Sequence, residues 1–147
     1  MGNDSVFKNF KKDFKDNLYK DYKGKYHNPD MIIIKGKCHF LFEHSSTGDR
    51  KVHIGELLQS YVYSIINECN TFFILLLDNR SKNGPSKEYE TERLKYYMDY
   101  LINFPKDTNY YFNFRVEYFS DYSSPEKINK LITKIQSEYS DICNMQT

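Results

Sequence analysis

The chain has 147 residues, of which 28% are charged, and a formal net charge of +1 at pH 7. This length predicts one domain over residues 1–147, able to bury about two-thirds of the surface that the unfolded chain exposes. The near-neutral charge excludes a protein that binds nucleic acid through a bulk excess of positive charge alone, but not an enzyme whose acidic site offsets basic groups elsewhere.

Neither the cysteines nor the apolar runs point to an extracellular or a membrane protein. The three cysteines, Cys38, Cys69 and Cys143, are too few and too scattered for a disulfide framework or a metal knuckle. Cys38 and Cys69 fall in or beside apolar segments and are expected to be small buried side chains. The longest apolar run, residues 72–77, is too short to span a bilayer, and the N-terminus is too polar for a signal peptide. We therefore expect a cytoplasmic protein with no membrane partner.

Apolar spacing predicts the elements of the first half of the chain. Steps of three and four between apolar residues predict a helix over residues 5–22. Two apolar runs on either side of Lys35-Gly36-Lys37 predict antiparallel strands over residues 31–35 and 38–44. A second helix is predicted over residues 52–67, and its apolar stripe consists of Ile54, Leu57, Leu58, Tyr61 and Ile65.

The second half of the chain continues the alternation. A buried strand is predicted over residues 72–77, a helix over 86–103, and a half-exposed strand with alternating polarity over 110–119. The last helix begins at the capping sequence Ser123-Ser124-Pro125-Glu126. This order predicts an α/β protein with a central mixed sheet of four to five strands flanked by helices.

Two acids mark the predicted hairpin. Asp30 follows Pro29 at the start of the first strand, and Glu43 lies at the end of the second, after the twelve residues 31–42. Neighbouring strands lie roughly 5 Å apart, so these carboxylates can share a divalent cation such as Mg²⁺. Taken alone, the pair is equally consistent with a turn aspartate and a solvent-facing acid at a strand end.

The helix after the hairpin carries a second pattern. Gln59 and Tyr63 are four residues apart, which places them about 40° apart around the helix axis. Their face also bears Glu56 and is expected to point away from the apolar stripe. It could be an ordinary polar helix face, with Glu56 either solvated or an additional ligand for a metal or a water.

Together the hairpin and this helix resemble the PD-(D/E)XK nuclease superfamily, in particular its RecB-type branch. The resemblance implies a restriction-endonuclease-like core and Mg²⁺-dependent hydrolysis of DNA, with Mn²⁺ able to replace Mg²⁺ and RNA not excluded as substrate. It implies that Asp30 and Glu43 ligate the metal and that Gln59 and Tyr63 support the site or contact DNA. It also implies a first core strand, which here would have to fit into residues 24–28. A homodimer or a larger complex is expected because the chain is short.

The chain departs from the family at one position. The family has a lysine two residues after the second acid, and this chain has Ser45. Lys51, just before the second helix, is the expected substitute near the phosphate. The alternative alignment on Asp49-Arg50-Lys51 is disfavoured because Asp49 lies in a loop. His44 is expected to point away from Glu43 and to be structural. The departure leaves a second hypothesis open: a nuclease-like fold without catalysis that acts as a binding or inhibitory protein.

Overall fold

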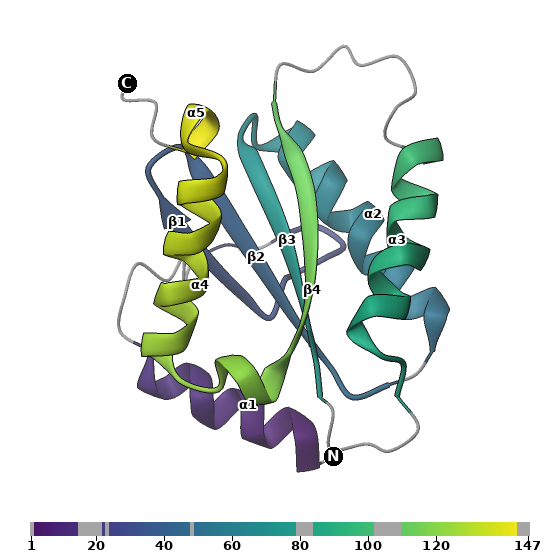
Figure 1. The fold of residues 1–147 in the computed structure, drawn as a ribbon, viewed down its shortest axis with the longest axis vertical. Helices are drawn as coiled ribbons and strands as arrows, with labels where there is room; N and C mark the ends of the chain where they lie inside the picture. Colours follow the sequence, from purple (N-terminus) through teal and green to yellow (C-terminus); the bar gives the residue numbers. More distant parts are fainter. Residues whose placement is uncertain are drawn as a thin grey trace.

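A mixed four-stranded sheet forms the centre of the computed structural model, which describes residues 2–14, 22, 24–47, 49–78, 84–101 and 110–143. The strands lie in chain order (Figure 1). β1 runs antiparallel to β2, whereas β2, β3 and β4 run parallel to one another. The predicted fold class, an α/β protein with a mixed sheet flanked by helices, is therefore confirmed. The strands are β1 (Met31–Lys35), β2 (Cys38–Ser45), β3 (Asn70–Leu77) and β4 (Phe112–Tyr118).

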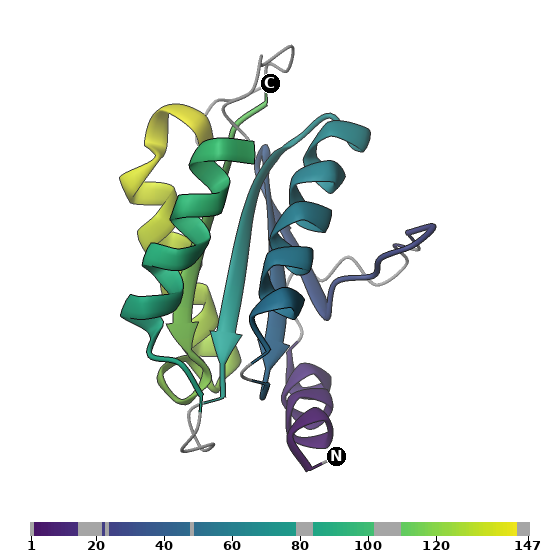
Figure 2. The same cartoon turned by 90° about the vertical axis from the view of Figure 1, so that its right-hand side faces the viewer.

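Helices cover both faces of the sheet, as Figures 1 and 2 show. One face is covered by α1 (Gly2–Asp13), α4 (Pro125–Glu138) and α5 (Ser140–Cys143), and the other by α2 (Arg50–Ile66) and α3 (Lys87–Leu101). A short 3₁₀ helix, η1 (Phe119–Tyr122), joins β4 to α4. Among the helices described, none combines the length and the apolar character that crossing a bilayer requires.

The alternation of side chains along the strands explains the two layers of core. On β2, Phe40 and Phe42 pack against α1 and α4, whereas Leu41 packs against α2. On β3, Phe72 and Ile74 face the first layer, while Phe73 and Leu75 face the second. Strands buried on both faces read as continuous apolar runs in the sequence, as observed here.

The predicted bounds agree with the structure for most elements, and α1 is the main correction. The helix predicted over residues 5–22 ends at Asp13, and neither Phe14 nor Tyr22 is helical; residues 15–21 lie outside the described part. Phe14 is buried in the core directly after the helix. Its backbone N–H donates a hydrogen bond of 3.2 Å to the carbonyl oxygen of Lys11, three residues earlier in the chain. Phe14 thus continues the apolar stripe without continuing the helix.

Two further details differ from expectation at element starts. Residues 24–30 form no strand, so the family's first core strand has no counterpart there. The cap of α4 is Ser124, whose side chain accepts from Lys127 N, rather than a reciprocal capping box starting at Ser123.

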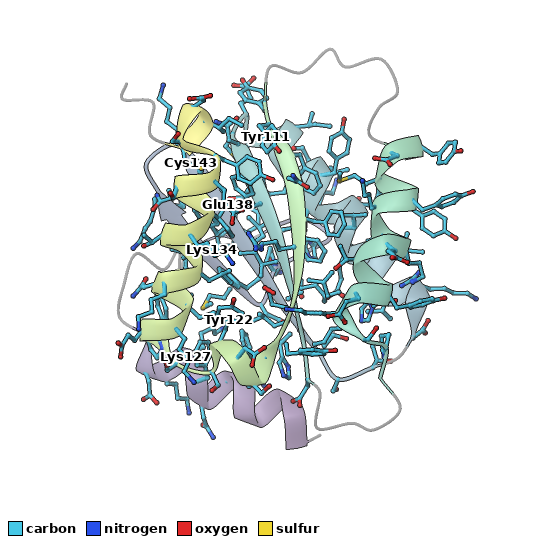
Figure 3. All side chains as sticks on the ribbon, viewed as in Figure 1. Tyr111, Tyr122, Lys127, Lys134, Glu138 and Cys143 are labelled. Atoms are coloured by element: carbon cyan, nitrogen blue, oxygen red, sulfur yellow. The ribbon has the colours of Figure 1, made fainter. Side chains whose placement is uncertain are left out.

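The β1–β2 turn and α5 meet at one end of the molecule. Gly36 has φ +59°, a conformation that glycine adopts without steric cost. A Cβ at this position would lie 3.0 Å from the carbonyl oxygen of Cys143. The Cys143 thiol, labelled on α5 in Figure 3, contacts the Cys38 thiol of β2 with 2.6 Å between the sulfur atoms. Cys38, Cys69 and Cys143 are all buried, as predicted for the first two.

Candidate functional site

Asp30 and Glu43 lie across from each other at the end of the β1–β2 ladder. The last paired residues are Met31 and Phe42, so the next position brings Asp30 opposite Glu43. Because side chains alternate, both acids point to the α2 side of the sheet, opposite to Met31 and Phe42. The predicted convergence of the two acids is thus what the strand register produces.

Asp30 is held in place by two elements. Its Oδ2 accepts the backbone N–H of His44 at 2.9 Å. Its backbone carbonyl accepts from the Lys11 ammonium at 2.8 Å, which ties α1 to the start of β1. Lys11 therefore brings a positive charge to this corner, where α1 lies against the end of the sheet (Figure 1).

A third carboxyl group, that of Glu56 on α2, joins the pair. Glu43 is only 5% exposed, and its Oε1 lies 2.8 Å from Nε2 of His27. Burial and the neighbouring Asp30 raise the pKa of Glu43 to about 8. Burial and the neighbouring Glu43 raise the pKa of Glu56 to about 9. Burial lowers the pKa of His27, although Glu56 and Asp30 act in the opposite direction.

The donor set suits a hard divalent cation. Glu56 Oε1 is buried without a hydrogen-bond partner, although the Glu43 and Glu56 carboxyls lie within hydrogen-bonding reach of each other. Three crowded carboxyls and an orphaned oxygen are relieved by a cation that takes oxygen ligands. Within the described ranges, no group of three or more histidine, cysteine or acidic side chains is arranged so that it could hold a metal ion as it stands. A cation here would therefore need these side chains to rearrange, with water completing its shell, as Mg²⁺ usually requires.

Ser45 lies beside the acids and begins a buried chain of hydrogen bonds. Its Oγ is 2.7 Å from Nε2 of His53, and Nδ1 of His53 is 2.7 Å from Oε2 of Glu90. Arg93 holds Glu90 through two contacts, Nε to Oε1 at 2.8 Å and Nη2 to Oε2 at 2.7 Å. Burial alone would raise the pKa of Glu90, but the hydrogen bonds from Arg93 and His53 lower it below its usual range.

Gln59 and Tyr63 occupy different environments, which corrects the prediction of a shared polar face. Tyr63 is buried, and its hydroxyl lies 2.6 Å from Nδ1 of His39. Gln59 is exposed and lines a hollow of about 270 Å³ between α2 and residues 24–27. The predicted apolar stripe of this helix is also wrong in part, since Leu58 is 46% exposed and Ile65 is exposed as well. The helix is rotated so that Glu56 and Tyr63 face β1 and β2.

Lys51 does not join the described contacts of the carboxyl cluster. Its side chain is exposed, and its backbone N–H donates to Asp49 Oδ1, which caps α2. Lys51 lies five residues before Glu56, so the two side chains point about 140° apart around the helix. Asp49 caps α2 and lies in no strand, which agrees with the reason for disfavouring the alternative alignment.

Four residues of this region were not singled out by the sequence: Lys11, His27, His53 and Glu90. Lys11 and His27 come from segments far from the hairpin, and no spacing links them to it. His53 and Glu56 are three residues apart and therefore share a helix face, which is the one local signal that could have paired them. His44 points to the opposite sheet face, as predicted, where it contacts Asp78 at 3.1 Å and stacks on Phe7.

No family model, no curated protein and no solved structure matches this chain.

Proposed function

We propose that this protein is a Mg²⁺-dependent nuclease of the PD-(D/E)XK type that hydrolyses phosphodiester bonds of DNA. The observation that carries the proposal is the convergence of Asp30, Glu43 and Glu56 from three segments of the chain, with Glu43 buried and the other two half-buried. Carboxyls packed this closely have raised pKa values unless a counter-ion is present, and a divalent cation between them would supply that charge.

Each residue of the cluster has a role in this proposal. Asp30, Glu43 and Glu56 would hold the metal, which would polarise the phosphate and lower the pKa of a bound water. His27 orients Glu43 through its 2.8 Å contact, and Lys11 sets the position of Asp30. Tyr63 and His39 support α2 against the sheet. Lys51 and Gln59 are exposed and available to contact the nucleic-acid backbone rather than the cluster.

The position of the cluster supports the same reading. Glu43 and Ser45 lie at the carboxyl end of β2, and β2, β3 and β4 are parallel. In open α/β sheets, ligands bind outside the carboxyl ends of the strands.

The test is cleavage of supercoiled DNA in the presence of Mg²⁺ or Mn²⁺. We expect cleavage by the wild type and loss of at least about 100-fold in rate for Asp30→Ala and for Glu43→Gln, because each removes a metal ligand. Glu92→Gln on α3 is the matched control, since Glu92 is exposed and lies on a different helix. Equal rates for Glu43→Gln and wild type would overturn the proposal.

A second candidate function is a nuclease-like fold that binds DNA or a nuclease without catalysis. It is favoured by one observation, that Ser45 takes the place of the family's lysine and already pairs with His53. Such a protein would bind DNA in a gel-shift assay with equal affinity with and without Mn²⁺. Dependence of binding on Mn²⁺ and on Glu43 would favour the nuclease.

A further inference from the structure

The chain Ser45–His53–Glu90 lies directly beside the carboxyl cluster. Ser45 and Glu43 are two residues apart on the same face of β2, which separates them by about 6.6 Å along the strand. Their partners on α2, His53 and Glu56, are three residues apart on one helix face. The contacts Glu43–Glu56 and Ser45–His53 are thus neighbours between the same strand and the same helix.

The hydrogen bonds in this chain have a defined direction. Glu90 is paired with the Arg93 guanidinium by two contacts, so it is a carboxylate and can only accept. Nδ1 of His53 therefore carries the proton that Glu90 accepts. In the neutral imidazole, Nε2 then accepts from the Ser45 hydroxyl at 2.7 Å, a much shorter contact than the 3.5 Å from that hydroxyl to the Thr47 carbonyl. A serine hydroxyl that donates to a carboxylate-backed imidazole can pass its proton on.

Ser45, His53 and Glu90 differ in how far they are buried, and this difference assigns them different roles. His53 and Glu90 are 0% exposed, so neither can meet a substrate. Ser45 is 6% exposed, which is close to the value for Glu43. Ser45 is therefore the member of the chain that keeps some exposed surface, two residues from Glu43 on β2.

We propose that Ser45, at the position where the family has a lysine and backed by the positioning residues His53 and Glu90, takes the proton from the attacking water. This inference rests on the proposed nuclease function. The oxygen–phosphorus bond forms while the water proton passes to Ser45 Oγ and the serine proton passes to His53 Nε2. The bond from phosphorus to the leaving oxygen breaks, and that oxygen takes a proton from solvent. His53 then returns its proton to solvent, so one water is consumed.

The surroundings of His53 fit a proton acceptor. The described charged groups on α3 that face it are Glu90 and, behind Glu90, Arg93. On α2, Glu56 lies one turn further along. β2 presents the Ser45 hydroxyl, and β3 packs apolar side chains against the same helix. The negative charge of Glu90 stabilises the imidazolium that the transfer creates.

The first experiment is a double-mutant cycle on Mn²⁺-dependent DNA cleavage. Ser45→Ala and His53→Gln are each expected to lower kcat on the order of 100-fold with little change in KM. Because His53 acts through Ser45, the double variant is expected to be no slower than either single variant. Glu117→Gln is the control, since it alters a different ion pair, that of the buried Glu117 on β4 with Lys87. Its kcat is expected to remain within about twofold of wild type.

The second experiment measures the tautomer of His53 by NMR and does not depend on an activity assay. In protein labelled with ¹⁵N-histidine, the resonances of His53 are expected to show the tautomer with the proton on Nδ1. Ser45→Ala is expected to shift the Nε2 resonance, and Glu90→Gln is expected to change the tautomer population. A proton on Nε2 in the neutral ring would overturn the relay, whatever the cleavage assay shows.

The outcomes separate this inference from the function on which it rests. Cleavage that needs Glu43 but survives His53→Gln overturns the relay and leaves the nuclease in place. Effects of Ser45→Ala and His53→Gln that multiply in the double variant show that the two residues act independently, which overturns the relay. No metal-dependent cleavage by the wild type overturns both.

Discussion

At the scale of single residues, the site depends on how deeply two carboxyl groups are buried beside each other. Burial and proximity raise the pKa of Glu43 to about 8 and that of Glu56 to about 9. The metal-free folded protein therefore keeps protons on this pair at neutral pH, whereas the unfolded chain loses them near pH 4.5. The free energy of unfolding must fall as the pH rises from about 5 to about 9, because over that range the folded state binds more protons than the unfolded state.

This linkage predicts that Glu56→Gln has little effect near pH 5 and stabilises the metal-free protein near pH 9. The gain at high pH is expected to be about 2 kcal/mol or more, since each pKa unit corresponds to about 1.4 kcal/mol. Urea unfolding at a series of pH values, with chelator present, measures it. Glu92→Gln, which changes an exposed acid, is expected to leave the pH profile as it is. An unchanged profile in Glu56→Gln would contradict the burial of this pair.

At the scale of elements, the two glycines Gly36 and Gly55 are predicted to respond to alanine with opposite signs. Gly36 has φ +59° and a neighbouring carbonyl oxygen 3.0 Å from the position of a Cβ, so Gly36→Ala should destabilise by about 1–2 kcal/mol. Gly55 lies within α2 with no atom within 4 Å of a Cβ, so Gly55→Ala should stabilise by up to about 1 kcal/mol. Thermal unfolding of both variants checks the pair. A stabilising Gly36→Ala would mean that the β1–β2 turn does not have this geometry.

The elements also show why the sequence predicted the strands better than the site. Continuous apolar runs identify β1, β2 and β3, and the hairpin turn at Gly36 places Asp30 opposite Glu43. The rotation of α2 could not be predicted, because its apolar residues surround more than one face and Leu58 is exposed. That rotation decides that Glu56 and His53 point to the sheet. His53 and Glu90 are 37 residues apart and lie on two different helices, so no local sequence pattern predicts their contact.

At the scale of the whole molecule, the carboxyl cluster joins segments that are distant in the chain. Asp30 precedes β1, Glu43 lies near the end of β2, Glu56 belongs to α2, and Lys11 reaches Asp30 from α1. A cation held by this cluster can bind only where the fold has brought these segments together. Metal binding must therefore stabilise the folded state as a whole.

The final prediction couples the metal, the protons and the fold. Mn²⁺ at about 100 times its dissociation constant should stabilise the protein by about 2.7 kcal/mol, because it binds the folded state alone. The raised pKa values of Glu43 and Glu56 require that binding near pH 7 releases protons, since both carboxyls must ionise to ligate the metal. Calorimetry in buffers of different ionisation enthalpy should detect this release, and Glu56→Gln should reduce it by about one proton. Binding without proton release would place the metal away from these acids, and no binding would favour the inactive fold.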